Sequence, residues 1–146
     1  MNRTPTLLPR WLALPGAWIC FWIACAHLSP VMASDSYILK YQGSRLYSWD
    51  GTHLSTYQGA RRYTWDGHYL SLYQGQRRYE WDGKYISQYQ GQRILELDGN
   101  KIRKYQGSTL FEWDGRHISV YQGQRIFEVD GSVPVALLAL LAAGHL

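Results

Sequence analysis

The chain has 146 residues, with 15 Lys and Arg against 11 Asp and Glu, which gives a formal net charge of +4. Arg3 and Arg10 lie in the first 33 residues, so the rest of the chain carries 13 basic and 11 acidic residues, a net charge of +2. Such an even balance offers no broad basic surface and excludes nucleic acid as the expected partner. Both cysteines, Cys20 and Cys25, also lie in the first part, so the remainder contains no disulfide and no thiolate ligand.

Residues 1–33 have the layout of a signal peptide. A basic start precedes the apolar stretch 11–26, and Ala33 provides a small side chain for cleavage before Ser34. Cleavage after Ala26 and lipidation at Cys25 are weaker alternatives. The main alternative is an uncleaved anchor, because residues 11–33 contain no charged residue and are long enough for a bilayer of about 30 Å. Every version predicts an exported protein (periplasmic, envelope or secreted), with membrane contact only through residues 11–33 if they are retained.

Residues 34–131 repeat with a period of 16 residues. Tyr-Gln-Gly recurs six times, beginning at Tyr41, and Asp-Gly recurs six times in the same phase. Six matches in one register identify a tandem repeat. The Asp-Gly pairs, which we predict to form turns, are Asp50, Gly51, Asp66, Gly67, Asp82, Gly83, Asp98, Gly99, Asp114, Gly115, Asp130 and Gly131.

Each unit is predicted to be an antiparallel β-hairpin. Asp-Gly between aromatic and β-branched runs indicates a two-residue type I′ turn, and Gln-Gly indicates a second reversal with Gly at a positive φ. In the third unit this register pairs Trp81 with Lys84 and Tyr79 with Ile86, and requires no bulge. Trp81, Tyr79 and Ile86 then share one apolar face, which forms the core.

The predicted fold is therefore all-β, with six tandem hairpins in a meander that can close into a petal-like ring. Residues 1–33 form the signal or anchor helix, and the apolar tail 132–146 is predicted to be a terminal cap or a plug inside the ring. A transmembrane barrel is the alternative architecture. It is disfavoured because six-residue strands fall short of the roughly 9 to 11 needed, and because Arg and Glu would face lipid.

The unit YQGxRxYxWDGxxLSx resembles the short hairpin repeats of bacterial β-flower proteins, in which hairpins splay as petals around an axis. This resemblance covers residues 41–131 and implies the fold, but no known chemistry. A looser resemblance is to choline-binding and related cell-wall-binding repeats, which also build hairpins from Trp, Tyr and Gly. Their units are longer and order the aromatic residues differently, so their ligand sites are not carried over.

Repeated Trp and Arg residues are the candidate binding site. The arginines are expected near the Gln-Gly end of the aromatic face, where Arg beside Tyr and Trp is a common lining of sugar and anion sites. The alternative is that the aromatic rings are buried and that the arginines only stack on Tyr. The candidate binding residues are Trp49, Trp65, Trp81, Trp113, Arg45, Arg61, Arg77, Arg93 and Arg125.

No catalytic residue, cofactor or metal site is predicted. One Asp in each turn supplies too few oxygens for calcium, and no His pair has the spacing of a zinc site with a third ligand near. Ser and Glu residues repeat from unit to unit, whereas an active site is normally unique.

The sequence thus predicts a non-catalytic secreted or envelope protein that binds a glycan or cell-wall polymer multivalently. The alternative is a structural or protein-interaction scaffold that binds an envelope protein or oligomerises through an open edge strand. An enzyme is a minor alternative, for which the divergent fourth unit would have to supply polar residues that the others lack.

Overall fold

The computed structural model describes residues 35–146, so the predicted signal or anchor segment, residues 1–33, lies outside the described residues. The described part contains twelve β-strands and one α-helix. The elements are β1 (Ser36–Lys40), β2 (Arg45–Trp49), β3 (His53–Thr56), β4 (Arg61–Trp65), β5 (Tyr69–Leu72), β6 (Arg77–Trp81), β7 (Tyr85–Gln88), β8 (Arg93–Asp98), β9 (Lys101–Lys104), β10 (Thr109–Trp113), β11 (His117–Val120), β12 (Arg125–Asp130) and α1 (Val135–Ala142).

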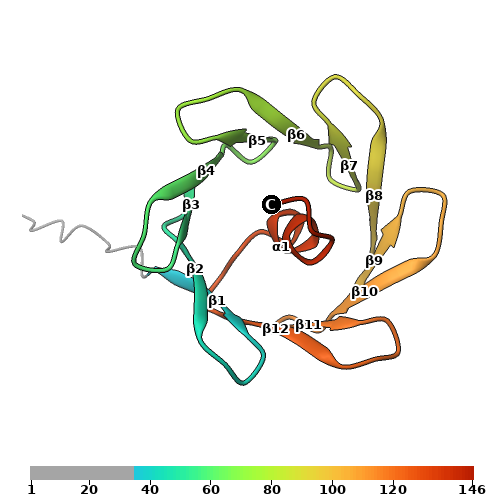
Figure 1. Cartoon of the computed structure of the whole chain (residues 1–146). Coiled ribbons are helices and arrows are strands. Elements are labelled where there is room, and N and C mark those ends of the chain that lie inside the picture. Colours follow the sequence, from blue (N-terminus) through green and yellow to red (C-terminus); the bar gives the residue numbers. More distant parts are fainter. Residues whose placement is uncertain (1–34) are drawn as a thin grey trace, which may run out of the picture. The chain divides into compact units, whose positions relative to one another are not determined.

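The strands form one closed antiparallel ring. Each strand pairs with its neighbours in the sequence, and β1 closes the ring by pairing with β12 through Ile38 and Val129. The hairpins that contain Tyr-Gln-Gly, such as β1–β2 and β3–β4, project outward from the ring (Figure 1). The prediction of an all-β array of hairpin repeats is confirmed. The half repeat at the start, β1, supplies the partner that the last strand needs.

The Asp-Gly loops are longer than predicted. Trp81 pairs with Ile86, so four residues rather than two lie between paired positions. The Asp82 carboxylate accepts hydrogen bonds from the backbone N–H groups of Lys84 (2.9 Å) and Tyr85 (2.7 Å). Only the glycine has a positive φ, +101° at Gly83, so the expected type I′ turn is wrong. The Asp side chain caps the loop and makes a second positive φ unnecessary.

The fourth unit has a different turn. Asp98 pairs with Lys101, so only Gly99 and Asn100 connect β8 and β9. Gly99 has a φ of +62° and Asn100 has no positive φ, which is the pattern of a type II′ turn. This is the one Asp-Gly hairpin with a two-residue turn, but its turn residues are Gly99 and Asn100 rather than the predicted Asp98 and Gly99.

In the Tyr-Gln-Gly turns the positive φ falls on a different residue from the predicted one. Gln, not Gly, takes the positive φ, 53° to 55° in all six copies, including Gln90. The following glycine is needed for space, because a Cβ on Gly91 would lie 3.1 Å from the Cβ of Gln88. The backbone N–H of Gly91 donates to the Gln88 carbonyl at 2.9 Å and closes the turn.

Each outward hairpin contains a bulge, which corrects the prediction of a bulge-free meander. Ile86 pairs with Leu95 but Ser87 pairs with Arg93, so Ile94 has no partner across the strand pair. The Ile94 carbonyl instead accepts a hydrogen bond from the backbone N–H of Tyr105 in the next hairpin, at 3.0 Å. The same register shift occurs in the other five outward hairpins. One extra residue moves every preceding side chain to the opposite face of the strand.

The interior of the ring is apolar and contains α1 (Figure 1). One aliphatic residue per unit is fully or almost fully buried, and Leu137, Leu138 and Leu140 of the helix have no exposed surface. The inward-facing series is Ile38, Leu54, Leu70, Ile86, Ile102 and Ile118. At the start of the tail, the backbone N–H of Ser132 donates to the Ser36 hydroxyl at 2.9 Å, which attaches the tail to β1. Among residues 35–146, no helix has the length and apolar character required to cross a bilayer.

Replacing Leu138 by Ala is expected to lower the free energy of unfolding by about 2–5 kcal/mol, because the lost side chain leaves a cavity inside the ring. Leu146→Ala, at a half-buried position, is the matched control and should cost clearly less. Chemical denaturation measures both values. Equal losses for the two variants would contradict the burial of α1.

Replacing Gln90 by Gly is expected to raise the free energy of unfolding by about 0.5–1 kcal/mol, because Gly adopts positive φ without a Cβ clash. Gln92→Gly tests the opposite case, since Gln92 has no positive φ. That variant should lose about 0.5–1 kcal/mol through the added freedom of the unfolded chain. Thermal or denaturant unfolding of the pair provides the comparison.

Candidate functional site

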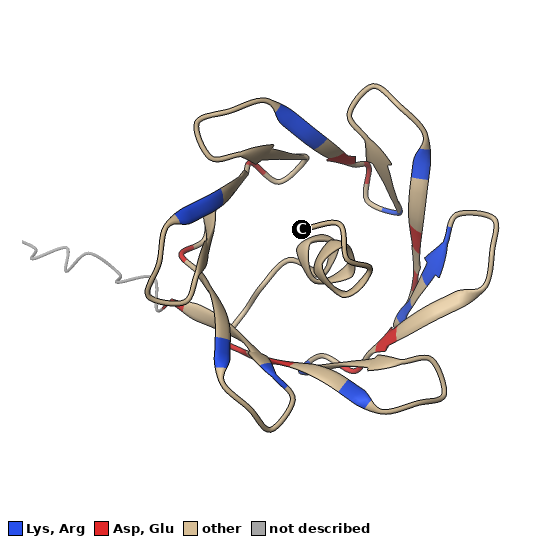
Figure 2. Ribbon diagram, viewed as in Figure 1, with Lys and Arg blue, Asp and Glu red and all other residues tan. Residues whose placement is uncertain are grey.

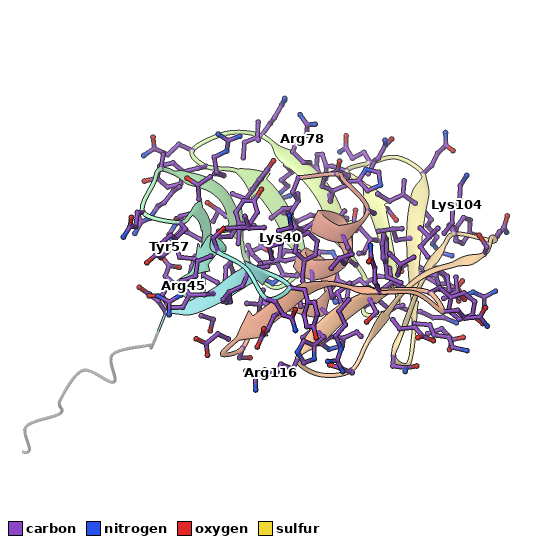
Figure 3. All side chains as sticks on the ribbon, turned by 60° about the horizontal axis from the view of Figure 1, so that its bottom comes forward. Lys40, Arg45, Tyr57, Arg78, Lys104 and Arg116 are labelled. Atoms are coloured by element: carbon purple, nitrogen blue, oxygen red, sulfur yellow. The ribbon has the colours of Figure 1, made fainter. Side chains whose placement is uncertain are left out.

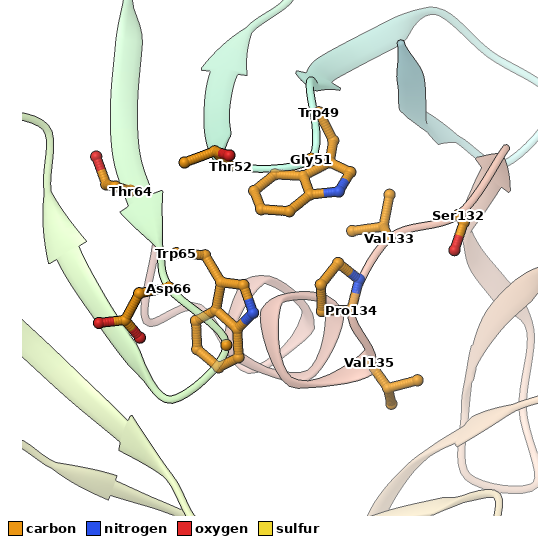
Figure 4. Close-up of a pocket in the computed structure, with 11 residues that line it drawn as sticks. Trp49, Gly51, Thr52, Thr64, Trp65, Asp66, Ser132, Val133, Pro134 and Val135 are labelled. Carbon is orange, nitrogen blue, oxygen red and sulfur yellow. The ribbon is translucent and has the colours of Figure 1, made fainter. Parts of the chain in front are cut away.

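The candidate Trp residues lie on the inner face of the ring. Trp49 and Trp65 are only 5% and 8% exposed, and Trp81 and Trp113 are half-buried. Trp49 and Trp65 line a pocket of about 760 Å³ together with Pro134 and neighbouring residues of the segment that leads into α1 (Figure 4). Their rings therefore serve mainly as contacts between the ring and its tail.

The candidate Arg residues lie on the outer face, which corrects the expectation that they share a face with Trp. Arg93 pairs with Ser87, whereas Leu95 pairs with Ile86 on the inner face. The bulge at Ile94 causes this change of face. The structure therefore does not bring the Trp and Arg residues together, and all five candidate arginines are exposed.

On the outer face Arg45, Arg77 and Arg93 each lie against two Tyr rings from neighbouring hairpins, and Arg61 and Arg125 each lie against one. The guanidinium carbon of Arg93 lies 4.0 Å from the centroid of Tyr85 and 5.7 Å from that of Tyr105. The two rings meet edge to face, with centroids 5.6 Å apart and planes at 87°. The other side of the guanidinium approaches the turn carboxylate of Asp82 at 3.7 Å. We call this arrangement of two rings, one Arg and one turn Asp an outer cluster.

The outer cluster repeats around the ring. Tyr69 and Tyr89 enclose Arg77, which lies 3.9 Å from the Tyr69 centroid. Two further copies replace the first Tyr by His, and one of them closes the circle between the last unit and the first. The ring pairs are Tyr37–Tyr57, His53–Tyr73, Tyr69–Tyr89, Tyr85–Tyr105 and His117–Tyr41, with centroids 5.6 to 5.9 Å apart. Their arginines are Arg45, Arg61, Arg77, Arg93 and Arg125.

The sixth outer cluster is built from different residues. Lys101 stands at the first ring position, 5.9 Å from the Tyr121 centroid, and Thr109 stands where the other units have Arg. Arg103 pairs with Thr109 across the strands, in place of the usual Ser opposite Arg. Its guanidinium approaches Asp98 at 3.7 Å, as Arg45, Arg61, Arg93 and Arg125 approach their turn Asp residues. In this cluster the arginine lies on the neighbouring strand. Arg103 is therefore a cluster residue that was not among the candidate binding residues predicted from the sequence.

Four of the turn Asp residues, Asp50, Asp66, Asp82 and Asp114, are held in their ionised form. At Asp114 burial raises the pKa, but hydrogen bonds from the backbone N–H groups of His117 and Arg116 and from the His117 side chain outweigh it, and the pKa falls to about 2. The same balance lowers the pKa of Asp50, where His53 and Thr52 donate. Each of these carboxylates is therefore a permanent acceptor for its Arg and its loop.

At Asp66 the largest effect is the hydrogen bond from the Tyr69 backbone N–H, which lowers the pKa despite burial, with a further contribution from the charge of Arg77. Burial raises the pKa of Asp82, but hydrogen bonds from Tyr85 and Lys84 lower it overall. Two of these residues, Arg77 and Tyr69, belong to one outer cluster. The electrostatic pattern therefore repeats along with the geometry.

Charge on the outer surface is locally balanced. Basic and acidic positions alternate around the ring (Figure 2), and Arg116 pairs with Glu128 at 2.7 Å. Lys84 pairs with Glu96 at 3.2 Å. Tyr57 and Tyr73 expose 37% and 36% of their surface beside Arg45 and Arg61, and Tyr121 exposes 37% beside Lys101. The outer clusters therefore present aromatic rings and paired charges rather than a field of one sign.

Within residues 35–146, no three His, Cys, Asp or Glu side chains lie close enough together to hold a metal ion. Comparison of the chain with models of protein families, with characterised proteins and with solved structures finds no match.

Acid is expected to destabilise the fold between about pH 4 and pH 2. The unfolded pKa of Asp is about 3.9, and the folded pKa of Asp114 is about 2. The stabilisation from a lowered pKa is complete above the unfolded value and is lost as the pH falls toward the folded value. Unfolding midpoints measured from pH 6 to pH 2 should therefore decrease steeply below pH 4.

Asp114→Asn should make that decrease shallower, because the amide still accepts hydrogen bonds but cannot be protonated. Asp98→Asn is the control, because in the described structure the Asp98 carboxylate accepts no hydrogen bond from a turn N–H. Identical acid profiles for wild type and Asp114→Asn would contradict the proposed role of the carboxylate.

Proposed function

We propose that the protein is an exported, non-catalytic binding module that recognises a neutral glycan polymer through its outer clusters. One observation carries this proposal: the combination of a Tyr or His ring, a second Tyr and an exposed Arg recurs around the ring, and Arg45, Arg61, Arg93 and Arg125 each also pair with a turn Asp. Repetition of a polar aromatic surface matches a ligand that itself repeats.

The composition of an outer cluster favours sugar hydroxyls over charged ligands. Arg93 is held between a Tyr ring at 4.0 Å and a carboxylate at 3.7 Å, yet 45% of its side chain remains exposed. An orientation fixed before binding reduces the entropy lost when a ligand is bound. Since Arg45, Arg61, Arg93 and Arg125 each pair with a turn Asp, these clusters offer donors and acceptors side by side without a net charge that would select an anion.

The inner Trp residues are not part of this proposed surface. Trp49 and Trp65 are buried against the segment that leads into α1. The aromatic residues that would contact the glycan are therefore the exposed tyrosines, such as Tyr57 and Tyr73, rather than the Trp residues. We assign α1 a structural role, as the plug that fills the ring and keeps its diameter constant.

Multivalency would provide the affinity. A single cluster of one or two exposed rings is a weak site, but clusters fixed on one rigid ring raise the effective concentration of each next contact along a polymer. The scaffold alternative loses its simplest mechanism, because β1 pairs with β12 and the closed sheet offers no open edge strand.

The experiment is a pull-down of the full chain with insoluble cellulose and chitin, with polygalacturonate as a polyanionic control. Retention on at least one neutral polymer, insensitive to 0.5 M salt, is expected. A triple variant, Arg45→Gln, Arg77→Gln and Arg93→Gln, should reduce retention at least tenfold, whereas Trp81→Phe on the inner face should reduce it less than twofold.

Circular dichroism and the melting temperature establish that each variant remains folded. If no neutral polymer retains the protein, or if the triple variant binds as well as wild type, the glycan proposal is wrong. Retention on polygalacturonate alone would also contradict it, because that result requires selection by charge.

A further inference from the structure

A second site lies on the inner face, at the end of the ring that carries the Tyr-Gln-Gly turns. It is a pocket of about 630 Å³ between β8, β9 and β10. Ile94, Leu95, Leu110 and Phe111 form its apolar walls, and Lys104 is among its lining residues. Ala142 and Ala143, at the end of α1, also line it. A volume of this size suits a small molecule.

The pocket has a clear origin in the repeat. Leu95 occupies the position that Tyr47, Tyr63 and Tyr79 occupy in the first three units. The Tyr79 ring reaches the end of the tail, where its hydroxyl donates to the His145 carbonyl at 3.4 Å. Leucine has no ring to fill the corresponding space, so a hollow remains beside α1.

A smaller pocket at an equivalent position of the ring supports this explanation. It has a volume of about 450 Å³ and is lined by Lys40, Ile126, Phe127 and Leu46, which correspond to Lys104, Ile94, Leu95 and Leu110. Phe127 stands in place of Leu95, and no helix residue lines this pocket. A larger side chain at this one position thus separates the pocket from the helix.

The charges at this end of the ring are basic. Lys104 pairs with Leu95 across β8 and β9, so its side chain is on the inner face, and within residues 35–146 it forms no ion pair. Arg78 and Lys104 lie on one side of the ring and Arg116, in an Asp-Gly loop, on the other (Figure 3). The acidic residues of the loops lie at that opposite end. Arg93, which also lines the pocket, already pairs with the Asp82 carboxylate at 3.7 Å.

We propose that this pocket binds a single-chain amphiphile with an anionic head group, with its apolar tail against Leu95, Phe111 and the end of α1 and its head at Lys104. The apolar walls stabilise the tail by removing it from water. The unpaired ammonium group of Lys104 attracts the head without breaking an existing ion pair. The pocket shares Arg93 and Tyr105 with one outer cluster, but the amphiphile would be held by Leu95, Phe111 and Lys104, so this proposal does not depend on glycan binding.

The test is calorimetric titration of the full chain with dodecanoate, dodecyl phosphate and 1-dodecanol, below the concentration at which each aggregates. Both anions should bind with a stoichiometry of one, at least tenfold more tightly than the alcohol. The ratio between dodecanoate and dodecyl phosphate distinguishes a carboxylate from a phosphate ligand.

Leu95→Tyr restores the residue of the first three units and should abolish binding without loss of stability, as judged by the melting temperature. Lys104→Gln introduces the residue that the third unit has at this position, Gln88. It should weaken the binding of both anions to the level of the alcohol. Lys40→Gln, at the smaller pocket, is the matched control and should leave binding unchanged. Absence of dodecanoate binding, or equal binding by Leu95→Tyr and wild type, would overturn the proposal.

Discussion

The interior of the closed ring must be filled, and the rest of the structure depends on this constraint. A barrel of about eight strands is just wide enough for its own side chains to fill, whereas a larger one leaves a lumen. Here twelve strands close on themselves, and the lumen contains α1, whose leucines contact the inward-facing aliphatic side chains. Because the ring and the helix bury each other's apolar surfaces, neither is expected to be stable alone. The two described inner pockets that touch the tail lie where this filling is incomplete.

The closed ring also gives every unit the same surroundings, which explains the regularity of the outer face. Five of the clusters combine an aromatic residue from one hairpin with a Tyr from the next, and the contact between His117 and Tyr41 joins the last unit to the first. Position 109 carries Thr where five other units have Arg, but Arg103 on the neighbouring strand keeps a guanidinium beside Asp98. An Arg on either of two paired strands can therefore lie beside the same turn carboxylate. This indicates that the ion pair, rather than an Arg at one sequence position, is required.

The two proposed sites use different properties of one repeat. The outer clusters depend on what the units share, whereas the inner pocket depends on how one unit differs, through Leu95. A repeat protein can thus combine a multivalent surface with a single unique cavity. The first favours a polymer and the second a small molecule, and the two proposed sites meet at Arg93 and Tyr105.

The sequence by itself determined the period, the strand content and the inner face, because apolar residues at alternate positions must face a common core. The predicted pairing at the Asp-Gly loops was wrong by two residues, but this did not change the predicted faces. Pairing Trp81 with Ile86 instead of Lys84 keeps every side chain on the same face. The bulge at Ile94 was different, since an odd number of extra residues moved Arg93 to the outer face. Nothing in the local sequence marks that bulge, because it satisfies a hydrogen bond to Tyr105 of the next hairpin, a partner that only the tertiary structure supplies. The closure of β1 on β12 and the position of α1 likewise depend on contacts between residues far apart in the chain, which local patterns do not encode.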